Sequence, residues 1–437
     1  MGKNYFQAIP IKESYDQKLI SFTSSLGAAI GKGETIPFAD NDVTYTLKLQ
    51  NDRIKEKDID LDYQVYKRTQ DSRIGNTFYD VEDWEDEHYT STVGFASLGV
   101  RRQVKKNGSV IYKDTLRHVF YGTVTDVISG DHPDNEVHIC PNCGADSSIE
   151  ELQNGCPYCG TQYKMDDLFP KITSYYFFDQ LRITKKQLLI GWPLCSLFCA
   201  ISALVFIPVL KSSPMLWRTI ESNFLSSTPT AIISCIVAIA GYGFFLFLLA
   251  HLLLKIVQAV FDRDRMGTAA SRDRFEIRMK KITPEFSYEY FKNKAISLIK
   301  TAVYSEDESE LLCYGGDQLP SEFKDIIDLN YAGTFGIKDF SEDKGMVTVD
   351  ARSYFDILSV NGNKVSYTHP VISATFRRRT DIPVNLNFKM TRIQCPSCGT
   401  SFNPVKNKFC PSCGNEYKLI TDDWVLVDLK RIDRSSY

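Results

Sequence analysis

Two long apolar stretches in the middle of the chain decide its fold: LLIGWPLCSLFCAISALVFIPVL at Leu188–Leu210 and AIISCIVAIAGYGFFLFLLAHLLL at Ala231–Leu254. They hold 23 and 24 residues, none of which is Asp, Glu, Lys or Arg. About 20 helical residues cross the hydrocarbon core of a bilayer, and a buried helix of a soluble domain rarely needs so long an apolar run. The sequence therefore predicts a hairpin of two transmembrane helices, with buried soluble helices as the alternative.

The basic residues beside these stretches predict the orientation of the hairpin. The segment Lys211–Thr230 between the stretches holds only Lys211 and Arg218. Nine basic residues lie near the outer ends of the two stretches, namely Lys171, Arg182, Lys185, Lys186, Lys255, Arg263, Arg265, Arg272 and Arg274. Because cytoplasmic flanks carry an excess of Lys and Arg, we expect a multi-pass protein of the cell membrane with both termini in the cytoplasm.

The cysteines indicate two metal sites. Eight of the 12 form four Cys-Pro-x-Cys-Gly motifs; 12 residues separate Cys143 from Cys156, and 11 separate Cys398 from Cys410. Two such turns place four thiolates around one tetrahedral ion, and a reducing cytoplasm disfavours disulfides. We assign one structural Zn²⁺ to Cys140, Cys143, Cys156 and Cys159, and a second to Cys395, Cys398, Cys410 and Cys413. A rubredoxin-like iron site is the alternative, and a redox dithiol is a weaker one because the motifs come in doubles.

The regions on either side of the apolar stretches read as mixed α and β structure. Helical spacing predicts helices over residues 11–30 and 284–303, and the glycines of GAAIGKG at Gly27–Gly33 are interpreted as a helix stop. Alternation predicts strands from Val43 onward, including VTYTLKL at 43–49. The acidic run Asp80–Glu87 is expected to be a solvated loop. Further strands are predicted in five segments, at 346–351, 353–360, 371–376, 385–393 and 423–432.

The two flanks resemble each other. A turn at Asn107–Gly108 precedes the first ribbon and one at Asn361–Gly362 precedes the second. Cys140 comes 32 positions after Gly108, and Cys395 comes 33 positions after Gly362. This parallel predicts a duplicated unit. We expect an α+β fold with two cytoplasmic regions, each a curved antiparallel sheet with a packed helix and a zinc ribbon. The boundaries are 1–139, ribbon 140–165, spans 188–210 and 231–254, basic linker 255–283, and 284–437 with its ribbon at 395–414.

The last region, with PEFSYEYFKNKA at its start and DDWVLVDLKRI near its end, resembles the Tim-forty-four-like domain over about 150 residues. The resemblance implies a fold like that of nuclear transport factor two, with helices over a curved sheet that leaves a conical cavity. It also implies a binding role at a membrane. Helical spacing places Phe291, Ala295, Leu298, Ile299 and Ala302 on one face, and we expect this face to pack on the sheet.

The motifs and the net charge of the chain argue against two classes of function, namely catalysis and general nucleic-acid binding. No motif pairs a nucleophile with one of the histidines, and a net charge of −3 argues against a general nucleic-acid binder. We expect a non-catalytic, membrane-anchored scaffold whose partner is a protein, a peptide or a lipid. An enzyme that uses the cone-shaped cavity, or a component of protein translocation or membrane transport, is the alternative.

Overall fold

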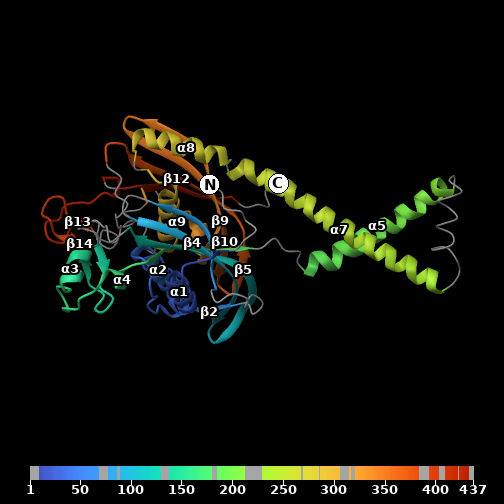
Figure 1. Ribbon diagram of the computed structural model, residues 1–437, viewed down its shortest axis with the longest axis horizontal. Coiled ribbons are helices and arrows are strands. Elements are labelled where there is room, and N and C mark those ends of the chain that lie inside the picture. The colour runs from blue at the N-terminus through green and yellow to red at the C-terminus, as the bar shows by residue number, and fades with distance from the viewer. Residues whose placement is uncertain are drawn as a thin grey trace. The chain divides into compact units, whose positions relative to one another are not determined.

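The computed structural model describes residues 9–67, 77–85, 89–128, 137–179, 185–211, 229–266, 269–284, 286–305, 314–315, 320–382, 393–402, 409–421 and 423–432 (Figure 1). The chain forms two compact units. Unit 1 contains residues 1–180 and 266–437, and unit 2 contains residues 181–265. The two flanks of the apolar stretches, predicted as separate regions, thus belong to one unit. We call them the first and second halves of unit 1.

Helices α1 (Glu13–Lys32) and α2 (Asn41–Glu56) begin the first half. Gly33 ends α1 in the left-handed conformation, as predicted, with φ at 71°. Gly27 and Gly31 serve another purpose, because a Cβ at these positions would lie 2.0 Å from the Tyr63 carbonyl oxygen and 2.3 Å from that of Leu61. The absence of a side chain at Gly27 and Gly31 lets α1 pack closely against the strand that contains Leu61 and Tyr63.

The strand predicted at 43–49 is wrong, because these residues lie within α2. The Asp40 side chain caps this helix, and its Oδ1 accepts hydrogen bonds from the N–H groups of Asp42 and Val43 at 2.5 and 3.3 Å. Apolar residues at Val43, Leu47 and Ile54 are buried at helical spacing. The cap and this spacing outweigh the β-branched residues that suggested alternation.

The first sheet is antiparallel, in the order β1-β3-β4-β5-β8, with β2 also paired to β4. The prediction of a loop at Asp80–Glu87 is wrong for Asp80–Glu85, which lies in β3; residues 86–88 fall outside the described residues. The acidic strand can form because it pairs with β4 while the side chains of Glu82, Asp83 and Glu85 are exposed. The strands are β1 (Ile9–Pro10), β2 (Asp60–Lys67), β3 (Tyr79–Glu85), β4 (Tyr89–Lys106), β5 (Ser109–Val127) and β8 (Lys171–Asp179).

Helices α8 (Ala269–Ile282) and α9 (Tyr288–Tyr304) and the short helix η2 (Ser321–Phe323) begin the second half. The second sheet has the order β11-β10-β12-β15, with β9 paired to β10. Bulges interrupt the β9–β10 register at three places and favour local bending. The strand predicted at 385–393 lies outside the described residues except for its last one. The strands are β9 (Ile326–Asp343), β10 (Met346–Asn361), β11 (Lys364–Thr368), β12 (Val371–Arg379) and β15 (Val425–Ile432).

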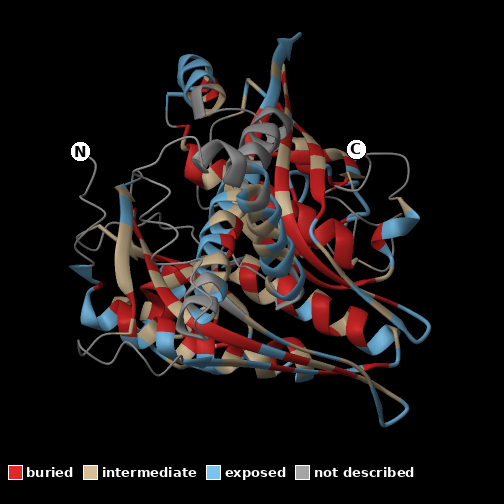
Figure 2. Cartoon of the chain, turned by 90° about the vertical axis from the view of Figure 1, so that its right-hand side faces the viewer, coloured by how far each residue is buried: buried red, intermediate tan, exposed pale blue. Residues whose placement is uncertain are grey.

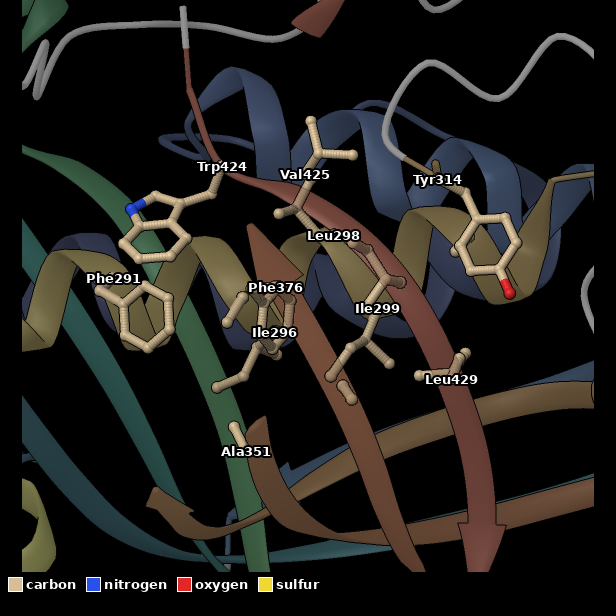
Figure 3. Packing of buried hydrophobic residues seen from close by; sticks show 14 of the residues in the cluster. Phe291, Ile296, Leu298, Ile299, Tyr314, Ala351, Phe376, Trp424, Val425 and Leu429 are labelled. Carbon is tan, nitrogen blue, oxygen red and sulfur yellow. The ribbon is translucent and has the colours of Figure 1, made fainter. Parts of the chain in front are cut away.

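Helix α9 packs on the second sheet as predicted (Figure 3). Its five predicted apolar positions are at most 1% exposed. The ring centroid of Phe291 lies 4.6 Å from that of Trp424 and 5.8 Å from that of Phe376. Figure 2 shows the buried residues gathered where helices meet sheets. Burial of this face stabilises the second half by roughly 1.5–3 kcal/mol per large apolar side chain.

The two halves have similar strand pairing. In the first half β4 pairs with β5, and in the second half β10 pairs with both β11 and β12. The strand after each ribbon extends the sheet, because β8 pairs with β5 and β15 pairs with β12. In the first half β2 and β3 pair with the two ends of β4, and in the second half the single strand β9 does the same for β10. Each half thus repeats one order: two helices, a sheet, a four-cysteine ribbon and a last strand.

Buried polar contacts join the halves. Arg102 of β4, 2% exposed, donates hydrogen bonds from Nη2 to Asp114 at 2.6 Å and from Nη1 to Asp328 of β9 at 2.9 Å. Gln50 Nε2 donates to the other oxygen of Asp328 at 3.1 Å. Arg53 donates to the carbonyl oxygens of Val303 and Ser305 at the C-terminal end of α9. An arginine at the negative end of a helix dipole is favourable, so these contacts fix α9 against the first half.

Unit 2 contains α5 (Lys185–Lys211) and α7 (Pro229–Met266), which cross each other in Figure 1. The helices touch closely, because a Cβ on Gly243 would lie 2.5 Å from the Cα of Ser196. The indole N–H of Trp192 donates to the carbonyl oxygen of Ala240 at 3.0 Å. Both predicted spans are therefore helical and in contact.

One stretch of unit 2, Ile236–Leu254 in α7, is long and apolar enough to cross a membrane by length and composition. The apolar part of α5 among the residues with described side chains, Leu188–Ala203, is shorter. The mixed α+β class with antiparallel sheets is confirmed, and the two-helix transmembrane hairpin stays a prediction.

Candidate metal centres and the cavity between the halves

Each half holds one of the predicted four-cysteine clusters, and within each cluster all four sulfurs lie within 4.8 Å of one another. The Sγ–Sγ distances include 3.7 Å for Cys140–Cys159 and 3.6 Å for Cys395–Cys413. A tetrahedral ion with Zn–S bonds of about 2.3 Å has sulfurs about 3.8 Å apart. The thiols fit a metal ion, and none of the eight forms a disulfide.

The backbone positions the sulfurs in the same way at all four motifs. The N–H of Gly144 donates to the carbonyl oxygen of Cys140 at 2.9 Å, and that of Gly399 does so to Cys395 at 2.8 Å. Gly160 and Gly414 repeat this contact, and all four glycines have φ at 73°. A residue with a Cβ rarely adopts this conformation. The glycine after each Cys-Pro-x-Cys is therefore what closes the turn.

Threonines assist one thiol in each cluster. The hydroxyl and backbone of Thr161 lower the pKa of the exposed Cys159 thiol to about 6, and Thr400 does the same for Cys398. Thr161 and Thr400 occupy the same position after their Cys-Gly pairs. Because a metal binds the thiolate rather than the thiol, Cys159 and Cys398 can bind a metal near neutral pH. A backbone hydrogen bond lowers the pKa of Cys143 and of Cys413, but desolvation and the neighbouring thiols raise it to about 12, so a metal would have to displace their protons.

Each ribbon also has a small structure of its own. Strands β6 (Val137–Ile139) and β7 (Asp146–Ser148) pair in the first, which continues into α3 (Ile149–Asn154) and α4 (Met165–Leu168). Strands β13 (Ile393–Gln394) and β14 (Ser401–Phe402) pair in the second, with helix η3 (Leu419–Thr421) after it. Both ribbons lie at the same end of unit 1 (Figure 1). The first ribbon has a small apolar cluster of its own, which includes Ile149, Leu152 and Leu168. A bound metal would add to the stability of both ribbons.

The chemistry open to these clusters is limited by their ligands. Four thiolates complete a tetrahedral shell and leave no position for a water or a substrate, which is typical of structural zinc. The same four sulfurs also suit iron, so that the identity of the metal stays a prediction. His138, two residues before Cys140, is 6% exposed and packs edge-on against Phe169 with ring centroids 5.1 Å apart. It is not part of the cluster.

A cavity of about 140 Å³ lies between the halves. It opens on the face of α9 opposite the one that packs on the second sheet, and so differs in place from the cavity that the resemblance implies. Its walls come from the polar face of α9, the start of α2, strands of the first sheet and residues beside the first ribbon. Residues that line it include Asp42, Thr46, Trp84, Tyr89, Ser91, Thr125, His138, Phe169, Thr173, Tyr175, Tyr290, Lys294, Ser297 and Lys300.

Two buried lysines of α9 face this cavity in different surroundings. Lys294 Nζ lies 3.0 Å from Asp423 and 3.7 Å from Asp42. Burial lowers the pKa of Lys294, but these carboxylates outweigh burial and raise it. The ammonium of Lys300 lies over the Tyr175 ring, 4.8 Å from its centroid, and burial lowers its pKa to about 8. A buried ionisable group in a cavity is a candidate for function.

An aspartate–histidine pair is present outside this cavity. His369 Nδ1 lies 2.6 Å from Asp356 Oδ1, and His369 is the more exposed partner. Neither residue lines the cavity, so the pair does not supply acid–base chemistry there.

Sequence reasoning found all eight cysteines and missed the cavity. Lys294 and Lys300 are polar residues on an amphipathic helix, and such residues normally face solvent; only the packing of the other half makes them buried. Comparisons of the chain with protein-family models, with curated proteins and with solved structures return no significant match.

Proposed function

We propose that this chain is a membrane-anchored, non-catalytic scaffold protein with two structural zinc ions. Its paired α+β halves are held at the cytoplasmic face of the cell membrane, where they bind a protein, a peptide or a lipid. The observation that carries this proposal is the joining of the two flanks of unit 2 in one compact unit.

This joining constrains how often the chain crosses a bilayer. Arg102 precedes unit 2 and Asp328 follows it, and the two share a buried hydrogen bond. Both residues must lie on one side of a membrane, so the intervening chain crosses an even number of times. If Ile236–Leu254 spans the bilayer, a second crossing is required, and α5 is the helix available for it.

The surface of unit 2 supports a lipid environment. Large apolar side chains on both helices are strongly exposed, among them Phe198 at 62% and Phe245 at 65%. Close contact through Gly243 and Ser196 is typical of helix pairs in membranes, where small residues let backbones approach. The basic flanks favour a cytoplasmic place for both termini, and the connector at 212–228 lies outside the described residues.

The scaffold role is supported by the closed metal clusters and by the sheet-and-helix halves. The arrangement of α9 over an antiparallel sheet is compatible with the Tim-forty-four-like resemblance, and a role in protein translocation or membrane transport is one form of this proposal. An enzyme is the second candidate function, and the observation in its favour is the buried Lys300 amine in a cavity.

Extraction of native membranes tests the anchoring. The full chain should stay in the membrane pellet after washing at high salt and after alkaline carbonate, and should dissolve only in detergent. Release by carbonate would contradict the anchoring. Crosslinking in those membranes followed by mass spectrometry should then recover one recurrent protein or lipid partner, whereas turnover of a co-purified small molecule would favour the enzyme.

A further inference from the structure

The cavity between the halves is large enough for a small aromatic molecule. Its volume of about 140 Å³ is close to that of an engineered cavity of about 150 Å³ that holds benzene. Both halves and the region beside the first ribbon contribute to its walls, so the site exists only in the assembled unit 1. This site does not depend on the proposed membrane anchoring.

Lys300 gives the cavity a positive charge that unit 1 does not neutralise directly. The residue is 8% exposed, and among the residues that the structure describes it forms no ion pair. Asp328 is the carboxylate that acts on it electrostatically, but the two oxygens of Asp328 accept hydrogen bonds from Arg102 at 2.9 Å and Gln50 at 3.1 Å. Because a buried charge is costly without a partner, this ammonium is suited to an anionic ligand.

Other residues that line the cavity indicate which kind of anion it could bind. A row of hydroxyls crosses the first sheet, with 2.9 Å from Ser91 to Thr125 and 2.9 Å from Thr125 to Thr173. Asp42 also lines the cavity, and its carboxylate lies 3.7 Å from Lys294. A nearby carboxylate disfavours a doubly charged phosphate by repulsion. A single negative charge is therefore the better match.

Aromatic side chains form another part of the lining. Trp84, Tyr89 and Phe169 come from the first half, and Tyr290 comes from α9. Flat apolar rings beside a few polar groups are typical of pockets that hold small organic ligands. A planar body with one acidic group would meet both kinds of wall.

We propose that this cavity binds a small planar monocarboxylic acid, whose carboxylate pairs with the Lys300 ammonium and whose body lies against the aromatic wall. The hydroxyl row gives the ligand further hydrogen-bond partners.

Calorimetry on the full, zinc-loaded chain in detergent tests this site with benzoate and with its neutral analogue benzamide. Benzoate should bind, and benzamide should bind at least about tenfold more weakly, as expected for the loss of a charged hydrogen bond. Lys300→Met should weaken benzoate binding by a similar factor, and Lys300→Arg should retain more of it. Lys292→Met, on the same helix but outside the cavity lining, should bind benzoate like the wild type.

Three results would overturn the proposal: no binding of benzoate, equal binding of benzoate and benzamide, or unchanged benzoate binding by Lys300→Met. The last two would indicate a site that does not use the charge. The calorimetry does not involve membranes, so a negative result there would not contradict the proposed membrane anchoring. Likewise, release of the protein by carbonate would not contradict the proposed ligand site.

Discussion

The guanidinium of Arg102 donates a hydrogen bond to the carboxylate of Asp328 at 2.9 Å, and the side chains of both residues are less than 10% exposed. The two are 226 residues apart in the chain. Arg102 precedes the two apolar helices in the sequence, and Asp328 follows them. Burial alone would lower the pKa of Arg102, but Asp328 and Asp114 raise it. The guanidinium is therefore charged at every accessible pH, and it needs its carboxylates.

Loss of one member of this pair should destabilise unit 1 strongly. Arg102→Met leaves the buried carboxylate of Asp328 and the partly buried one of Asp114 without their cation. The expected cost is about 3–5 kcal/mol, which is typical when one partner of a buried pair is removed. Denaturant unfolding of the full chain in detergent would measure it. Arg379→Met, which breaks an exposed pair with Asp381, is the control and should leave stability nearly unchanged. Equal stability of the two variants would contradict a buried junction between the halves.

Metal content is the second prediction. The purified chain should hold two Zn²⁺, and Cys410→Ser should retain one, because each cluster draws its four ligands from one half. Elemental analysis measures the stoichiometry. Cys195→Ser, a change in α5 outside both clusters, should keep both ions. Iron in place of zinc would favour the rubredoxin-like alternative, and disulfides among the eight cysteines would exclude both metals.

The free energy of unfolding should depend on pH because the Lys300 amine is buried. Its folded pKa of about 8 lies below the ordinary value of 10.5, so the unfolded state holds more protons between these values and Lys300 makes stability rise with pH there. Below about pH 8 the buried charge destabilises the protein in full.

Lys300→Met should therefore be more stable than the wild type at pH 7, by on the order of 1–3 kcal/mol, and the difference should shrink as the pH rises from 8 toward 10.5. Thermal unfolding at several pH values measures this, with Lys292→Met as the control. A difference that is constant over this range would show that Lys300 does not titrate as its burial requires.

Features that depend on residues close together in the sequence can be predicted from it, and contacts between distant residues cannot. The cysteine clusters and the apolar face of α9 were predicted because spacing along the chain determines them locally. Asp40 caps α2, whereas the β-branched residues Val43 and Thr44 favour a strand at the same place. The first glycines of Gly27–Gly33 serve a contact with β2 that no local pattern reveals.

The contact between the two halves could not be predicted from the sequence, because it joins residues that are far apart in the chain. Arg102 in β4 and Asp328 in β9 each resemble an ordinary charged residue in an alternating strand. Their burial depends on a surface supplied from more than 200 residues away, as does the cavity that contains Lys300.

The most direct test of the account is the topology of the full chain in intact cells, measured with a membrane-impermeant thiol reagent. The unpermeabilised cells should label an engineered cysteine at Ser213, in the connector, and should leave those at Lys106 and Ser435 unlabelled until the membrane is opened. The count of nine basic residues on the flanks against two in the connector and the Arg102–Asp328 contact both lead to this pattern. Labelling of only one of the two flank positions from outside would place the halves on opposite sides of the membrane and contradict the account.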